Sequence, residues 1–210
     1  MAAKPVRKST APRTSAEKPA ETASERLVWK PGTLEAPLPP VLVTCGTLEQ
    51  PNVLTIAWSG IVNSDPAMTY ISVRPERYSF DIIRKSGEFV INLPTQSLLR
   101  AVDYCGVRSG RDTNKIADCH LDLLPGAKVS APLILQSPLQ LECRVRRELP
   151  LGSHHMFLAE ILAVRVDSRL LDDTGRLALE RASLIAYVHG QYFSLGKVLG
   201  KFGYSVRKKR

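Results

Sequence analysis

The chain consists largely of short apolar runs, rich in β-branched and aromatic residues, that are separated by Gly, Pro, Asn and Asp. Several runs alternate apolar and polar residues, and this period of two is typical of half-buried strands. The predicted strands are VLVTCG (41–46), LTIAWSGIV (54–62), TYISV (69–73), EFVINL (88–93), LQLECRVRREL (139–149), MFLAEILAVRVD (156–167) and SLIAYVHGQYF (183–193). Seven strands with few helices favour a closed β-barrel over an alternating βαβ fold.

Two helices are predicted to interrupt the strands. The first follows Ser79, where apolar residues recur with helical spacing, and Gly87 is expected to end it. The second covers TQSLLRAVDYCG (95–106). No glycine-rich phosphate loop follows a strand, because GVRSGRD (106–112) follows a helix and lacks the G-x-G-x-x-G spacing. Any nucleotide must therefore be bound in another way.

The length of 210 residues, with 44% hydrophobic residues, suits one domain with a substantial core. Residues 1–25 consist mainly of Ala, Pro, Lys, Ser and Thr, so we predict a disordered basic N-terminal tail. The folded domain is expected at 26–206, with order beginning near Leu27. Residues 207–210 are predicted to be a basic C-terminal tail.

The formal net charge of +9 lies mostly at the two ends of the chain. Residues 1–30 contain seven Lys or Arg and three Glu, and all four residues of 207–210 are basic. The rest of the chain is nearly neutral, which argues against a basic stripe built into the fold. An aromatic fraction of 6% is also low for a protein that stacks bases. We interpret the ends as solvated segments and do not expect nucleic acid as a partner.

The sequence favours a cytoplasmic protein. No apolar run reaches the roughly 18 residues of a membrane-spanning helix, and the first residues lack the apolar core of a secretory signal. The four cysteines are widely spaced and form no C-x-x-C motif, which argues against a zinc site and a disulfide framework. We expect no metal site and no membrane partner.

The stretch SVRPERYS (72–79) places two arginines and several hydroxyls between a predicted strand and a predicted helix. Arginine binds phosphate oxygens through two hydrogen bonds, and a helix N-terminus offers unpaired N–H groups. Ser79 is expected to cap this helix or to be its first residue. The stretch therefore predicts an anion site without a glycine loop. The alternative is a surface turn whose arginines pair with Glu76, Asp81 or water.

A second stretch, NVLTIAWSGIVNSDPAMTYISV (52–73), reads as an apolar hairpin that carries the small polar residues Thr55, Ser59, Asn63 and Ser64. The backbone N–H groups of such a strand edge can donate to the carbonyl and nitrogen atoms of a flat heterocycle. The alternative is an ordinary barrel strand, and composition alone does not decide between the two.

These stretches together resemble a known family. NVLTIAWSGIVNSDPAMTYISVRPERYSFDIIRKSGEFVINLP (52–94) is similar to the core signature of the flavin reductase-like, FMN-binding split-barrel proteins of the flavoredoxin type. The resemblance continues in DYCGVRSGRDTNKI (103–116), LGSHHMFLAEILAV (151–164) and YFSLGKVLGKFGYSVRKK (192–209), and it covers about residues 38–207. It implies a mainly β, split-barrel fold with a few short helices, and a homodimer with FMN near its interface.

The resemblance also implies cofactor contacts. The strand edge expected against the isoalloxazine ring is formed by Thr55, Ile56, Ala57 and Trp58. The residues that match phosphate and ribityl contacts are Ser72, Arg74, Arg77, Tyr78 and Ser79. Asn92 matches a position on the flavin side of the barrel, and its alternative role is a buried amide satisfied by the backbone.

The loop CGVRSGRDTNK (105–115) matches a segment that lies near the cofactor in relatives, often across a dimer interface. Its candidate contacts are Cys105, Ser109, Arg111 and Lys115. The alternative for Cys105 is a small buried hydrophobe. His154 matches the histidine of a GxH stretch, with a structural role as its alternative. His189 and Tyr192 are further candidates to line the site.

The resemblance implies an FMN-dependent oxidoreductase in which NADH or NADPH passes hydride to FMN, and electrons continue to free flavin or a partner protein. Such transfer requires no protein acid or base, so no catalytic residue is assigned beyond the candidate His154. The alternative is a non-enzymatic electron-carrier module that holds FMN permanently. The sequence neither selects NADH or NADPH nor names the electron acceptor.

Overall fold

The computed structural model describes residues 25–206. Residues 25–33 belong to a unit separate from the rest and contain no helix or strand. Leu27, near which order is expected to begin, is exposed, and the first strand starts at Val41. Apart from Glu25, the two predicted tails lie outside the described residues.

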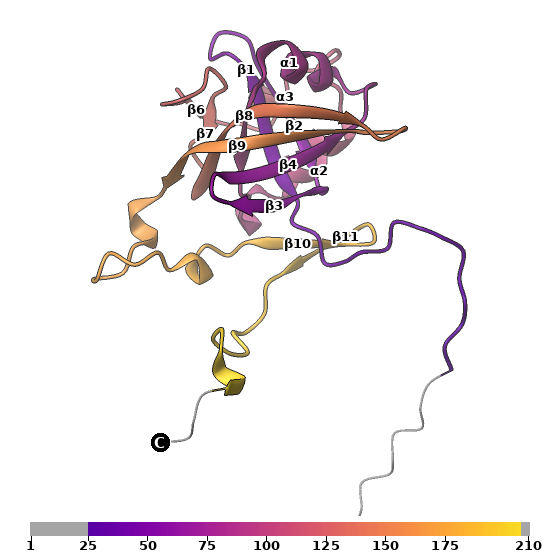
Figure 1. The fold of residues 1–210 in the computed structure, drawn as a ribbon. Helices are drawn as coiled ribbons and strands as arrows, with labels where there is room; N and C mark the ends of the chain where they lie inside the picture. Colours follow the sequence, from indigo (N-terminus) through magenta and orange to yellow (C-terminus); the bar gives the residue numbers. More distant parts are fainter. Residues whose placement is uncertain (1–24, 207–210) are drawn as a thin grey trace, which may run out of the picture. The chain divides into compact units, whose positions relative to one another are not determined.

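Within the described residues, seven strands form one antiparallel sheet in the order β2-β1-β5-β8-β9-β4-β3. The strands are β1 (Val41–Gly46), β2 (Pro51–Ile56), β3 (Ser59–Ser64), β4 (Ala67–Val73), β5 (Glu88–Asn92), β8 (Leu139–Pro150) and β9 (His155–Val166). Figure 1 shows β8 and β9 as the two long strands beside β4 and β3.

The sheet is a split barrel. β2 and β3 stand at opposite ends of the strand order, yet only Ala57 and Trp58 separate them in the chain. A link this short spans roughly 10 Å at most, so the sheet must curl until its ends approach each other. Trp58 lies at this junction, where its carbonyl accepts a hydrogen bond of 3.0 Å from the N–H of Ser72. The mainly β split barrel that the resemblance implies is therefore confirmed, whereas the closed barrel favoured by the strand pattern alone is corrected, since β2 and β3 are not paired in the described sheet.

Shorter elements complete the described chain. They are the helices α1 (Tyr78–Ser86), α2 (Leu99–Val107) and α3 (Lys115–Asp118), the hairpins β6 (Leu123–Leu124) with β7 (Leu133–Ile134) and β10 (Ile185–Val188) with β11 (Gln191–Ser194), and the 3₁₀ turns at Gln96–Leu98, Ser168–Leu170, Leu179–Arg181 and Tyr204–Val206. None of the helices within residues 25–206 is long and apolar enough to cross a membrane.

The core has two main parts, on either face of β1. Val41 and Val43 are buried in one hydrophobic cluster, together with Phe157 of β9. Leu42 between them is buried in a second cluster, together with Val102 of α2. Successive residues of a strand point to opposite faces, and β1 is buried from Val41 to Cys45 because both of its faces are covered. This arrangement fixes α2 next to the β1–β2 pair, where the candidate site lies.

Most predicted strands are confirmed, but two predicted runs are wrong as single strands. The run 54–62 is interrupted at Ala57 and Trp58, because β2 pairs with β1 whereas β3 pairs with β4 at the far end of the sheet. The run 183–193 is a hairpin, β10–β11, with His189 at φ 46° and Gly190 at φ 83° between its strands. These two positive φ angles reverse the chain direction.

Both predicted helices are confirmed. α1 ends at Gly87, whose φ is 66° and whose N–H donates to the carbonyl of Ile83 at 2.8 Å. The expectation that Ser79 caps this helix is wrong: the N-cap is Arg77, no side chain caps it, and Ser79 is the second helical residue. Ser79 is instead buried, and its hydroxyl oxygen accepts a hydrogen bond from the side chain of Asn52.

Candidate functional site

A hollow of about 420 Å³ lies beside the junction of β2 and β3. Its lining includes seven of the predicted cofactor contacts, namely Thr55, Ile56, Ala57, Trp58, Ser72, Arg74 and Arg77. Three further rings line it, those of His154, Tyr187 and Tyr192. We call it the aromatic hollow. β2 has a neighbouring strand on one side only, so backbone groups on its other side can meet a ligand.

The aromatic side chains of this hollow form two contacting pairs. The rings of Trp58 and His154 have centroids 4.5 Å apart, and those of Tyr187 and Tyr192 are 5.4 Å apart. Among the described lining residues the only carboxylate is that of Asp103, and the hydroxyl of Tyr192 donates to it at 3.3 Å. Burial, followed by the nearby Asp103 charge, raises the pKa of Tyr192 to about 12, so this hydroxyl keeps its proton near neutral pH.

His154 stands in the turn between β8 and β9. Burial and then the positive charge of Arg74 lower its pKa below the ordinary value of 6.5. The imidazole is therefore mainly neutral at pH 7. Its Nδ1 lies 3.0 Å from the hydroxyl of Ser153, which holds the ring in place beside Trp58.

A second hollow, of about 580 Å³, adjoins the first and shares Leu54, Thr55, Arg74 and Arg77 with it. Its cationic lining residues are Arg74, Arg77, Arg108, Arg111 and Lys115. Among the described lining residues Glu76 is the only acid. We call this the basic hollow. Its excess of positive charge marks it as a binding site for an anion.

Lys115, the first residue of α3, is only 4% exposed. The only hydrogen bond of its ammonium within residues 25–206 is a long one, 3.5 Å, to the carbonyl of Cys105. No carboxylate in the described chain pairs with it. Burial lowers its pKa, and the nearby Arg77 guanidinium also favours the neutral amine. A buried cation of this kind is costly unless an anion approaches it.

Two arginines of the basic hollow donate hydrogen bonds to backbone carbonyls. Arg77 Nη1 donates to the carbonyl of Gly106 at 3.0 Å, and Arg111 Nη1 donates to that of Glu76 at 3.0 Å. The Arg111 guanidinium also lies 5.6 Å from the ring centre of Tyr78. These contacts orient the guanidinium groups without neutralising their charge.

A buried amide supports the floor of the basic hollow. Asn52 Nδ2 donates to Ser79 Oγ at 2.5 Å, so the serine hydroxyl is held in place and retains its own hydrogen for a ligand. Gly110 packs closely on Asn52 and on the neighbouring Tyr78, since a Cβ there would collide with both side chains. Only glycine lets the 108–114 loop approach this closely.

The structure brings together nearly all of the predicted cofactor contacts. Those lining the basic hollow are Thr55, Arg74, Arg77, Tyr78, Ser79, Cys105, Ser109, Arg111 and Lys115. Cys105 is also packed in the α2 cluster, and burial raises its thiol pKa to about 12, which fits the alternative role of a small hydrophobe. His189 lines neither hollow.

Asn92, predicted to face the flavin side of the barrel, lines neither hollow. It is completely buried; its Nδ2 donates to the carbonyl of Leu42 at 3.0 Å, and its Oδ1 accepts from the N–H of Ile134 at 2.8 Å. The alternative role, an amide satisfied largely by backbone, is the observed one. The physical reason is that Asn92 joins β5 to β1 and to the β7 segment.

Sequence reasoning missed five residues of the site. They are Asn52, Asp103, Arg108, Gly110 and Tyr187. Arg108 and Gly110 lie in the loop that carries Ser109 and Arg111, so their position in the sequence was a usable signal. Asn52 also gave a signal, as an amide at the start of an apolar run. Tyr187 gave none, because its place depends on how the β10–β11 hairpin packs.

Comparison with known proteins agrees with this geometry. Residues 33–196 match the model of the flavin reductase like domain. Flavoredoxin of Desulfovibrio vulgaris (Miyazaki F) superposes with a TM-score of 0.80 at 27% identity, over 87% of this chain and all of that chain. Flavoredoxin from Methanosarcina acetivorans gives 0.79 at 25% identity, over 88% of this chain and all of that chain.

A curated relative points the same way. The NADH-dependent FMN reductase AsuE2 of Streptomyces nodosus subsp. asukaensis is 30% identical over 122 residues, which are 57% of this chain and 64% of that protein. The family model covers most of the chain and the described fold is a mainly β split barrel with a few short helices. The chain therefore belongs to the flavin reductase-like family of split-barrel proteins.

Proposed function

We propose that the chain binds FMN, with the phosphate in the basic hollow and the isoalloxazine ring in the aromatic hollow. Lys115 is the observation that carries this proposal, because its buried ammonium lies beside Arg77 and has no carboxylate partner in the described chain. A phosphate monoester brings nearly two negative charges to such a place. Family membership and the likeness to AsuE2 support FMN as the molecule that carries this phosphate.

The donors around the basic hollow suit a phosphate group. Arg77 can donate two parallel hydrogen bonds, Lys115 supplies a point charge, and the Ser79 hydroxyl remains a donor because its oxygen accepts from Asn52. Arg111 and the hydroxyl of Ser109 lie on the same hollow. These residues would hold the phosphate, and they fit it without a glycine-rich loop.

The ring of FMN would lie along the free edge of β2, at Thr55, Ile56 and Ala57. The two hollows meet at Leu54 and Thr55, so a molecule with a flat ring and a phosphate tail can occupy both. Their combined space is of the size usual for small-molecule sites. Trp58 and the neutral His154 would limit the access of water to this end of the site.

The bound cofactor would supply hydride chemistry, and we propose that the protein is an NAD(P)H-dependent oxidoreductase that passes electrons to free flavin or a partner protein. The chain's own part is to bind and orient the reactants. The likeness to the NADH-dependent reductase AsuE2 supports this reading. The second candidate is a non-enzymatic electron carrier, and the likeness to two flavoredoxins along their whole length supports it.

Two measurements test this proposal in turn. The absorbance spectrum of the purified protein, and identification of the released cofactor, should show FMN. A colourless protein that fails to bind added FMN would overturn the assignment. Anaerobic mixing of the FMN-loaded protein with NADH, and separately with NADPH, should then bleach the flavin band. FMN binding without bleaching by either nucleotide would favour the electron carrier.

We also propose that the protein forms a homodimer. The β3 strand presents the exposed apolar residues Ile61 and Val62, and the segment after β11 presents Leu199 and Phe202, which are almost fully exposed. Apolar side chains in such number are usually covered by another molecule. Sedimentation equilibrium should give twice the chain mass of 23.2 kDa. A monomer with full FMN occupancy would contradict the dimer.

A further inference from the structure

Arg74 differs from the other cations that the sequence assigns to the phosphate. Among the described residues, its guanidinium has no hydrogen bond and no carboxylate partner, and its side chain is exposed. It lines both hollows, as Arg77 does. However, Arg77 Nη1 donates to the carbonyl of Gly106, whereas the guanidinium of Arg74 has no such contact among the described residues. Arg74 is therefore the freer of the two to meet a ligand in the aromatic hollow, and its charge also lowers the pKa of His154 there.

The surroundings of Arg74 are suited to a flat ring. The Trp58–His154 and Tyr187–Tyr192 pairs line the same hollow and offer aromatic surfaces for stacking or edge contacts. The neutral state of His154 adds no charge there, and Asp103, which accepts from the Tyr192 hydroxyl, is the only acid among the described lining residues. Arg74 and Arg77 are the two cations of this hollow without a carboxylate partner in the described chain, and of the two only Arg74 has a guanidinium without a hydrogen bond there.

From these observations we infer that Arg74 binds the anionic group of a substrate that lies beside FMN in the aromatic hollow. We infer further that this substrate is a planar aromatic ring carrying a carboxylate or a phosphate. The guanidinium of arginine matches both groups through paired hydrogen bonds. This inference rests on the proposed function, since FMN would occupy the β2 side of the same hollow. It assigns a substrate class to the proposed reaction and a role to Arg74 outside FMN binding.

Calorimetric titration of FMN-loaded protein tests the inference with ligand pairs that differ in charge. Benzoate is compared with neutral benzamide, and nicotinamide mononucleotide with nicotinamide riboside. In the wild type, at least one member that carries the carboxylate or phosphate should bind about tenfold to hundredfold more tightly than the partner that lacks this group. The pair with the larger ratio identifies the source of the anionic group, an aromatic acid or a nucleotide.

Arg74→Gln should bring that ratio close to one. The matched control is Arg147→Gln, because Arg147 is an exposed arginine of β8 that lines neither hollow, and it should keep the wild-type ratio. A second readout is the ratio of FMN to riboflavin dissociation constants, which Arg74→Gln should leave unchanged.

Three results would overturn the inference: ratios near one for both pairs in the wild type, a ratio that survives Arg74→Gln, or a changed FMN-to-riboflavin ratio in that variant. The last result would make Arg74 a phosphate ligand instead. Failure of the protein to load FMN is a separate outcome, which would overturn the proposed function before any second ligand is added.

Discussion

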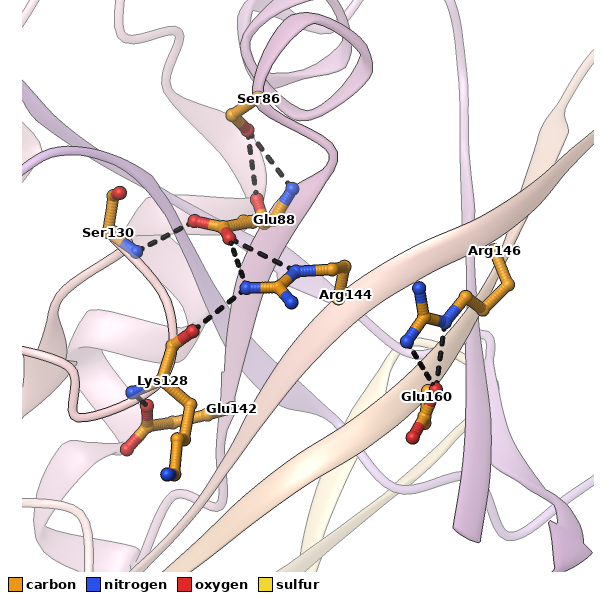
Figure 2. Close-up of polar contacts among 8 residues, drawn as sticks. All are labelled: Ser86, Glu88, Lys128, Ser130, Glu142, Arg144, Arg146 and Glu160. Atoms are coloured by element: carbon orange, nitrogen blue, oxygen red, sulfur yellow. Dashed lines mark hydrogen bonds and ion pairs between the residues drawn. The ribbon is translucent and has the colours of Figure 1, made fainter. Parts of the chain in front are cut away.

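Two regions of the molecule differ in whether their positively charged side chains are paired with carboxylates. On β8, Arg144 donates to the carboxylate of Glu88 at 3.1 Å, and Arg146 binds Glu160 through two nitrogen atoms (Figure 2). In the basic hollow, Arg77, Arg111 and Lys115 contact backbone carbonyls, and none of these three has a carboxylate partner among the described residues. The chain supplies its own anions where cations stabilise the sheet. It leaves them out where an anion is expected from outside.

The region of β8 also shows how completely a structural polar group is satisfied. Glu88 accepts from Arg144 and from the N–H of Ser130, and Arg144 also donates to the carbonyl of Lys128 (Figure 2). The buried Glu142 is an exception, because one of its oxygens accepts from the N–H of Lys128 while the other has no partner among the described residues. Lys115 is different because its ammonium is buried with a single long hydrogen bond. We interpret the poorly paired Lys115 ammonium as destabilising the protein without ligand, and we expect a bound anion to offset this cost.

The largest expected effect comes from Lys115→Met, which removes the buried charge and keeps an unbranched apolar side chain. FMN should bind about a hundredfold to a thousandfold more weakly, as for loss of one partner of a buried ion pair. Riboflavin binding should change little. Without ligand, the free energy of unfolding should rise, because an unpaired buried cation is gone. Fluorescence titration and urea unfolding measure the two effects.

The control for this variant is Lys85→Met, since Lys85 is exposed at the end of α1 and lines neither hollow. It should change neither FMN binding nor stability appreciably. If Lys115→Met binds FMN as tightly as the wild type does, Lys115 is not a phosphate ligand, and the proposed difference between the two regions is contradicted.

A smaller effect is expected from Arg77→Ala. Loss of a charge-assisted hydrogen bond of about 1.5–3 kcal/mol should weaken FMN binding about tenfold to hundredfold, whereas riboflavin has no phosphate to lose. Arg77→Lys should recover only part of this affinity, because a point charge cannot reproduce the two-pronged contact. The measurement is the FMN-to-riboflavin ratio of dissociation constants. An unchanged ratio, with the exposed Arg100→Ala as control, would return Arg77 to the role of a surface turn residue.

The β8 region should respond in the opposite sense. Glu88→Gln keeps the size of the side chain but removes the charge that faces Arg144. The free energy of unfolding should fall by about 1 kcal/mol or less, because the pair is partly exposed. FMN affinity should not change. A clear loss of FMN affinity with retained stability would show that the two regions are not independent.

The smallest expected effect is a dependence of stability on pH that comes from Lys115. Its pKa is lowered in the folded chain, so the unfolded chain binds more protons between that lowered pKa and 10.5. Stability without ligand should therefore rise with pH in this window. The difference in unfolding free energy between the wild type and Lys115→Met isolates this contribution from the cysteines, which titrate nearby. FMN should reduce the slope, since phosphate favours the charged ammonium. If the unfolding free energy of the wild type, relative to that of Lys115→Met, falls as the pH rises, the lowered pKa of Lys115 is contradicted.

Much of the fold follows from local patterns. The alternating run 139–149 and the apolar run 41–46 became strands because side-chain period and β-propensity act within a few residues. Gly87 ended α1 because only a residue free to take a positive φ fits there. The errors had longer-range causes. The run 54–62 reads as one strand, yet its two halves pair at opposite ends of the sheet.

The sequence by itself determined the strand-rich architecture and the chemical character of the SVRPERYS stretch, because these depend on residue type and neighbours in the chain. Only the tertiary structure decided which cations lack an acid partner. The resemblance names Lys115 as a candidate contact, but its burial beside Arg77 depends on how α2, α3 and β2 pack together. Likewise, Asn92 has the polarity of a ligand contact, but the packing of β5 between β1 and β8 encloses it. Charge and polarity are properties of a residue, whereas desolvation and pairing are properties of the fold.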